Sequence, residues 1–284
     1  MTFIKFARFD IEHGVLMRWR QLLLTVLFSF LAGLLHLLSL RVYELVHPDY
    51  LELRPLMGDF LLTIFGGCSA NAIQETGVNF QVPFLWLAYV CWMLFLVLRY
   101  PLEELNGMGK HQLILSGQRS AWWFSKCIWV GAETTASFLA VCLGACLAGV
   151  PVRAKCSLGV NSYLFAELSL SQTGLNPPPW NLFGLLAANL CVLIALGMAQ
   201  MLLSLYLKPM YAYLIVVAYL LLSTYFDHPL FLGNYLMAAR SSCLLQTGYD
   251  YVTGCLVGLW LAVVIAILGW CCFENYDILG RDEP

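Results

Sequence analysis

Charged residues are scarce in this sequence. Asp, Glu, Lys and Arg together make up 11% of the 284 residues, whereas hydrophobic residues make up 61%. Because a soluble domain usually carries about 25% charged residues, this chain lacks the polar surface that would keep it in water. The mean hydropathy of +0.76 agrees with this conclusion. The composition therefore predicts an all-α polytopic membrane protein.

A strong net charge is also missing. The formal net charge is −2, and the isoelectric point is near 6.2. Such a chain has no basic surface that could attract a nucleic acid. We therefore exclude nucleic acid as a partner.

The motifs of three kinds of site are absent as well. A nucleotide-binding loop needs G-x-x-x-x-G-K-[ST], but at Gly109-Lys110 the first glycine is replaced by Glu104, and His111 follows the lysine. The 11 cysteines include no CxxC pair and no zinc spacing. Only His36 lies within a predicted span, and no nucleophile or metal ligand is evident beside it. We expect no enzyme activity and no metal or cofactor bound by this chain.

The hydrophobic runs predict about six membrane-spanning helices in a single domain, residues 1–284. A spanning helix needs about 20 mainly apolar residues. The predicted spans are residues 21–40, 83–98, 122–150, 180–207, 210–226 and 255–273. Lys208-Pro209 separates the fourth span from the fifth, because proline cannot continue a hydrogen-bonded helix. The run Phe60–Phe65 is too short to cross and ends in Gly66-Gly67.

The N-terminal segment lacks the small-residue cleavage site of a signal peptide. Its apolar residues recur near helical spacing, with basic residues between them: Phe3, Ile4, Phe6, Ala7, Ile11, Val15 and Leu16. This pattern predicts an interfacial helix on the inner membrane surface. An ordinary helical lead-in to the first span is the alternative.

The distribution of basic residues predicts the orientation. With the N-terminus inside, ten of the 15 Lys and Arg residues lie in inner segments and five in outer ones. Inner loops usually carry the excess of Lys and Arg. We therefore expect both termini in the cytoplasm, an inner loop at 100–120, and outer loops at 41–82, 151–179 and 227–254.

The inner loop between the second and third spans carries the most informative pattern. Pro101 can open a helix, and Glu103 and Glu104 suit its positive first turn. Gly107 and Gly109 follow, and then a short apolar stretch, Leu113-Ile114-Leu115. Arg119 and Lys126 lead back into the membrane. We expect a short amphipathic helix at the membrane face with both glutamates exposed to the cytoplasm.

This loop resembles the inner loop of type-2 permeases of the ATP-binding cassette superfamily. The similarity lies in the acidic pair, the glycines, the leucine-rich stretch, the step Ser116-Gly117-Gln118-Arg119, and Lys126. It extends loosely over the chain, since residues 228–251 match in position the short outer helices of such permeases. The long outer loops depart from the plainest members and suggest a particular subfamily.

The resemblance implies a permease subunit of an exporter in the plasma membrane. The loop would be a coupling helix, with Glu103, Glu104, Gly107, Gly109, Leu113 and Arg119 facing a separate cytoplasmic ATPase that holds ATP and Mg²⁺. A second permease, identical or homologous, would complete the transporter. An ion- or proton-coupled secondary carrier and a non-transporting scaffold or immunity component are the alternatives.

Polar residues within the predicted spans are candidates for a translocation path. Glu133 is the only acidic residue that lies inside a long apolar run, and burying an ionisable group costs about 2.5–3.5 kcal/mol on insertion scales. Its side chain either faces a translocation path or a partner permease, or is protonated or locally paired. Asn189 and Gln200 are interhelical hydrogen-bonding groups or part of the same path. On the outer side, Cys68 and Cys156 are a conceivable disulfide pair.

Overall fold

The computed structural model describes residues 2–46, 55–68, 82–160, 182–242 and 248–276. These residues form helices and two isolated β-bridges. The longer helices are α1 (Thr2–Gly14), α2 (Trp19–Val46), α5 (Phe84–Val97), α8 (Arg119–Gly149), α10 (Phe183–Ser204), α11 (Pro209–Tyr225) and α13 (Tyr251–Glu274). The shorter elements are η1 (Leu16–Arg18), α3 (Met57–Phe65), α6 (Tyr100–Asn106), α7 (Met108–Ser116), α12 (Gly233–Leu236) and η3 (Ala238–Arg240).

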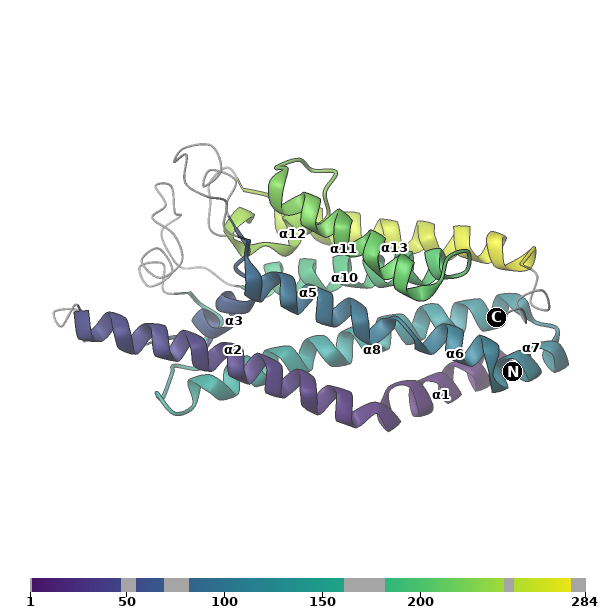
Figure 1. Ribbon diagram of the computed structural model, residues 1–284, viewed down its shortest axis with the longest axis horizontal. Helices are drawn as coiled ribbons and strands as arrows, with labels where there is room; N and C mark the ends of the chain where they lie inside the picture. Colours follow the sequence, from purple (N-terminus) through teal and green to yellow (C-terminus); the bar gives the residue numbers. More distant parts are fainter. Residues whose placement is uncertain (1, 47–54, 69–81, 161–181, 243–247, 277–284) are drawn as a thin grey trace.

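The helices run along the long axis of an elongated bundle (Figure 1). The most extensive contacts join α2 to α8 and α10 to α13. The helices α1, α6 and α7 lie at one end of the bundle, which we call the loop end, and α3 and α12 lie toward the other (Figure 1).

Small residues allow the two main helix pairs to pack closely. A Cβ on Gly144 of α8 would collide with Ser29 Oγ of α2. A Cβ on Gly258 of α13 would lie 2.7 Å from the backbone carbon of Cys191 of α10. Close approach through small residues is how apolar helices associate where lipid, not water, surrounds them.

Each predicted span coincides with a helix, but the helices differ in length. In the part of the chain that the structure describes, four helical segments are long and apolar enough to cross a membrane: Phe3–Val42, Arg119–Gly149, Phe183–Ser204 and Tyr251–Glu274. Phe84–Val97 and Pro209–Tyr225 are shorter. At 1.5 Å per residue, the 14 residues of α5 extend about 21 Å, less than the hydrocarbon core of about 30 Å. The break at Lys208-Pro209 is confirmed, since α10 ends at Ser204 and α11 begins at Pro209.

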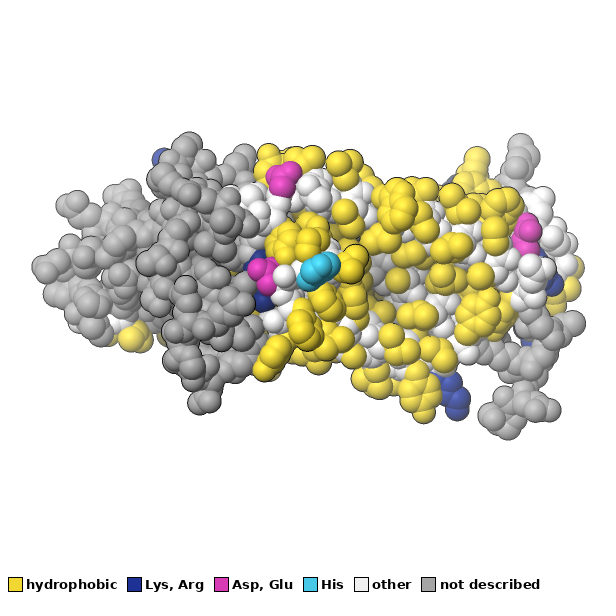
Figure 2. Space-filling model, turned by 90° about the horizontal axis from the view of Figure 1, so that it is seen from above, with side chains coloured by type: hydrophobic (Ala, Val, Ile, Leu, Met, Phe, Trp, Pro, Cys, Tyr) yellow, Lys and Arg dark blue, Asp and Glu magenta, His cyan; other side chains and the backbone are white. Residues whose placement is uncertain are grey.

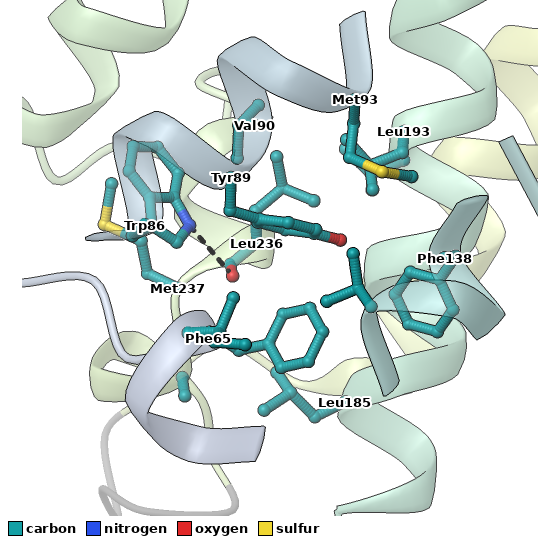
Figure 3. Packing of buried hydrophobic residues seen from close by; sticks show 14 of the residues in the cluster. Phe65, Trp86, Tyr89, Val90, Met93, Phe138, Leu185, Leu193, Leu236 and Met237 are labelled. Atoms are coloured by element: carbon teal, nitrogen blue, oxygen red, sulfur yellow. Dashed lines mark hydrogen bonds between the residues drawn. The ribbon is translucent and has the colours of Figure 1, made fainter. Parts of the chain in front are cut away.

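The short apolar run around residue 60 forms α3, whose residues are almost all buried. The Asp59 carboxylate accepts a hydrogen bond of 2.8 Å from the backbone N–H of Leu56 at the start of the helix. Phe65 packs edge-on against Tyr89 of α5, with ring centroids 5.0 Å apart, and beside Phe138 of α8 (Figure 3). Trp86 Nε1 donates 3.2 Å to the carbonyl of Leu236 (Figure 3). The buried helix α3, which is too short to span, therefore packs against α5 and α8, and α5 in turn is hydrogen-bonded to α12.

On the face that Figure 2 shows, charged side chains lie in two places, beside the grey atoms near the middle of the picture and toward its right-hand end, and the surface between them is mainly hydrophobic. Leucines of α2 contribute strongly, since Leu24, Leu31 and Leu38 are each more than half exposed. Such a band is the surface that lipid tails can cover.

Candidate functional site: a buried ion network at the loop end

The predicted inner loop folds as two short helices, not one. Helix α6 has Pro101 in its first turn. Gly107 ends α6 and begins α7 with φ −113° and ψ −134°. Gly117 ends α7 at φ 65°, the left-handed conformation that glycine adopts without strain. Glycine residues thus end each of the two short helices of this loop.

The two glutamates of α6 have different environments. Glu103 is exposed, and its carboxylate lies 3.5 Å from Arg18 Nη2. Glu104 is buried and forms an ion pair with Lys126 Nζ of α8. A Cβ on Gly109 would lie 2.7 Å from Glu104 Cγ, so the glycine leaves room for this side chain. The expectation that both glutamates are exposed is therefore wrong for Glu104, which is buried against a partner 22 positions further along the chain.

Lys126 lies at the centre of the network and is fully buried. Its Nζ is 2.5 Å from Asp10 Oδ1 of α1, and it lies 5.1 Å from the ring centroids of both Tyr100 and Trp122. The hydroxyl of Ser125 donates to Asp10 Oδ2, and that of Tyr100 donates 3.1 Å to Asp10 Oδ1. Burial raises the pKa of Tyr100, and the Asp10 carboxylate raises it further, so the phenol stays a donor. The ammonium group is thus enclosed by two carboxylates and two aromatic faces.

The N-terminal helix packs against α8. Phe6 and Asp10 are buried, and a Cβ on Gly14 would collide with the indole of Trp129. Spaced four apart, these three residues share one face of α1. The opposite side leaves Ile4 71% exposed. The expected interfacial helix is therefore corrected in one respect: α1 covers the start of α8 and continues along the bundle axis (Figure 1).

Two further residues predicted for coupling have structural contacts inside this chain. Arg119 Nη1 donates to the backbone carbonyls of Glu274, at 2.6 Å, and Tyr276, at 3.0 Å. Leu113 is buried. Among the loop residues whose burial the structure describes, the exposed apolar side chains are Ile114 and Leu115, which are 57% and 88% exposed. We call this pair the α7 tip.

The three residues predicted for a translocation path are buried but do not form one cluster. Glu133 accepts a hydrogen bond of 3.4 Å from Ser137, and within the described residues its Oε2 has no hydrogen-bond partner. Asn189 Nδ2 donates to Leu185 O of its own helix. Gln200 Nε2 donates 3.0 Å to Leu94 O of α5. Eleven residues separate Asn189 from Gln200, or about 16 Å along a helix.

Sequence reasoning missed the role of Arg240, which it counted only as an outer positive charge. Arg240 is buried. It donates to the carbonyls of Ser223, Thr224 and Cys68 at 2.7, 2.8 and 3.0 Å, and to Asn234 Oδ1 at 2.5 Å. Among the residues that the structure describes, no carboxylate forms an ion pair with it. The only available signal was an arginine in an otherwise apolar stretch after Leu236-Met237.

The two cysteines that we considered as a disulfide pair do not form one. Cys68 and Cys156 are both free thiols. Cys68 Sγ lies 3.6 Å from Thr224 O and from Arg240 Nη2, whereas Cys156 is exposed. Burial raises the pKa of the Cys68 thiol.

A family described as protein of unknown function (DUF2705) matches residues 52–279 of the chain. No curated protein matches the chain, and no solved structure does.

Proposed function

We infer that this chain, which belongs to the DUF2705 family, is the membrane-spanning permease subunit of an ATP-binding cassette transporter. Residues 84–97 and 209–225 would cross the bilayer together with the four long helices, giving six spans. The N-terminus and the end of α13 would lie in the cytoplasm of a cell whose plasma membrane holds the protein. Two such permeases, identical or homologous, would assemble with two cytoplasmic ATPase subunits that bind ATP and Mg²⁺.

The observation that carries this proposal is the α7 tip. Ile114 and Leu115 are neighbours in the chain, and 57% and 88% of their surfaces are exposed, so together they form an apolar projection on this loop. Glu104 and Arg119, on either side of the tip, are fixed to α8 and to the end of α13. An apolar projection held at both sides suits a groove in a partner protein.

The mechanism would be alternating access. Closure of the two ATPases on ATP would displace the α6–α7 loops, and the permease halves would rock about their interface. By resemblance, the direction would be export. Because the chain has no nucleotide-binding loop, the ATP-hydrolysing site would lie on the partner.

A second candidate function rests on Glu133. Its unpartnered oxygen inside a long apolar helix is the kind of group that binds a proton or cation in secondary carriers. In that case, transport by the purified chain in vesicles would follow an ion gradient without ATP.

Substitution of the α7 tip tests the main proposal. We expect Ile114→Asp/Leu115→Asp to insert normally but to lose a nucleotide-binding-loop ATPase that co-purifies with the tagged wild-type chain. The matched control is Leu230→Asp, since Leu230 is 77% exposed and lies outside the loop end. The proposal fails if the wild-type chain captures no such ATPase, or if the tip variant captures it equally well.

Labelling tests the proposed orientation. In intact cells, an impermeant maleimide should modify the native Cys156. In a variant without native cysteines, it should not modify a single cysteine placed at Lys110. Cys68 should react more slowly than Cys156, because it is partly buried and its pKa is raised. Rapid external labelling at position 110 would invert the topology and place the α7 tip on the wrong side for an ATPase.

A further inference from the structure

Three segments that are distant in the sequence meet at one side chain. Asp10 comes from α1, Glu104 from α6 and Lys126 from α8, and both carboxylates form ion pairs with Lys126 Nζ. The relative exposure of the three side chains is 2%, 7% and 0%. Such buried ion pairs are shielded from water and salt, unlike the pair Arg8–Glu12, which lies on the exposed face of α1.

The surroundings of Lys126 leave little room for these elements to slide past one another. Gly109 touches the stem of Glu104, and Gly14 touches Trp129, so both glycines mark close approaches of backbone to side chain. The ring of Tyr100 stacks on Trp129 with centroids 4.5 Å apart. A displacement of α6 would therefore have to move α8, or else separate a buried carboxylate from its ammonium group, which is strongly unfavourable.

We propose that Lys126 is a positioning residue that ties both α6 and α1 to α8, so that α6 and α1 follow the motion of that helix as one body. Glu104 is the link to the α6–α7 loop, and Asp10 is the link to α1. The joint is a property of this chain alone. Its use, the transfer of loop motion to the spanning helices, rests on the proposed transporter function.

The two links predict separable effects, which distance measurements can detect. Full-length chain without native cysteines would be placed in nanodiscs of phosphatidylcholine and phosphatidylglycerol. Spin labels would be attached at positions 115 and 139, which report the loop relative to α8, or at positions 4 and 139, which report α1 relative to α8. Leu115, Leu139 and Ile4 are all more than 60% exposed, so labels there disturb little packing.

We expect Glu104→Gln to abolish the narrow distance peak for 115–139 and to leave that for 4–139 unchanged. Asp10→Asn should have the reverse effect, and neutralisation of the exposed pair, Arg8→Gln/Glu12→Gln, should change neither. The neutral triple variant Asp10→Asn/Glu104→Gln/Lys126→Met contains no uncompensated charge. It should lose both narrow peaks, and it supplies the test if a single variant is not recovered folded.

Narrow peaks in the triple variant, or the same change in both distances for each single variant, would overturn the proposal. In that case the ion pairs would not be what holds α6 and α1 to α8. These measurements need no ATPase. Failure of the tip substitutions to affect ATPase capture would therefore count against the transporter function and not against the joint.

Discussion

Among the residues that the structure describes, each end of the bundle buries one cationic side chain, and the two cations are neutralised differently. At the loop end, Lys126 is held by the carboxylates of Asp10 and Glu104, on two other helices. At the opposite end, Arg240 is held by backbone carbonyls at the end of α11, by Cys68 O and by Asn234 Oδ1. The carbonyls that end a helix carry the negative pole of its dipole, which favours a cation there.

The difference separates two ways of fixing a membrane bundle. The guanidinium group presents five donors in a rigid fork, so the Arg240 contacts depend on geometry and need no counter-charge. The ammonium group of Lys126 is a compact charge on a flexible stem, so its contacts depend on the balance between one cation and two anions. We therefore expect the stability of the loop end to depend on the charges of these side chains, and the stability of the opposite end to depend on the shape of the guanidinium group.

The largest effect should follow from Lys126→Met, which leaves two buried carboxylates without their counter-charge. Removing one member of a buried ion pair costs about 3–5 kcal/mol. The neutral triple variant described above should regain most of this stability, because no buried charge is left unpaired. The free energy of unfolding, measured by titrating a denaturing detergent into mixed micelles, checks both. A triple variant as unstable as Lys126→Met would show that packing, not charge, stabilises this end.

Arg240→Lys should have the next largest effect. Lysine keeps the charge but cannot satisfy at once the backbone carbonyls of two segments and the side chain of Asn234, and each buried acceptor left unpaired costs about 1–3 kcal/mol. No neutralising partner substitution can rescue this variant, since no carboxylate among the described residues pairs with Arg240. The same unfolding measurement applies. If Arg240→Lys is as stable as wild type, the geometric account of this end is wrong.

The sequence predicted the helices well and the ion network poorly, for a physical reason. Hydrophobic runs and the Lys208-Pro209 break are local features, so the positions of α2, α8, α10, α11 and α13 follow from them. Burial of Glu104 depends on Lys126, 22 positions later, and on Asp10, 94 positions earlier. A single sequence shows no such pairing, and the acidic pair of α6 therefore suggested two exposed residues. Arg240 was misjudged likewise, because its acceptors are backbone carbonyls that no residue type reveals.

The smallest effect on stability should come from Glu103→Lys, and this variant separates folding from docking. Glu103 is 59% exposed and lies 3.5 Å from Arg18, so the ion pair is worth about 1 kcal/mol or less. Glu104→Lys, its neighbour, would instead place a second cation beside buried Lys126 and should unfold the loop end.

At an interface with an ATPase, like charges can cost several kcal/mol. We therefore expect Glu103→Lys to leave the unfolding free energy almost unchanged and to weaken ATPase capture, if the partner surface beside the α7 tip is basic. Glu103→Gln, which removes the charge without reversing it, is the matched control and should weaken capture less. Equal ATPase capture by the wild type, Glu103→Lys and Glu103→Gln would restrict the docking surface to the α7 tip. A large loss of stability in Glu103→Lys would show that the stability of the loop end depends on its exposed charges as much as on Lys126.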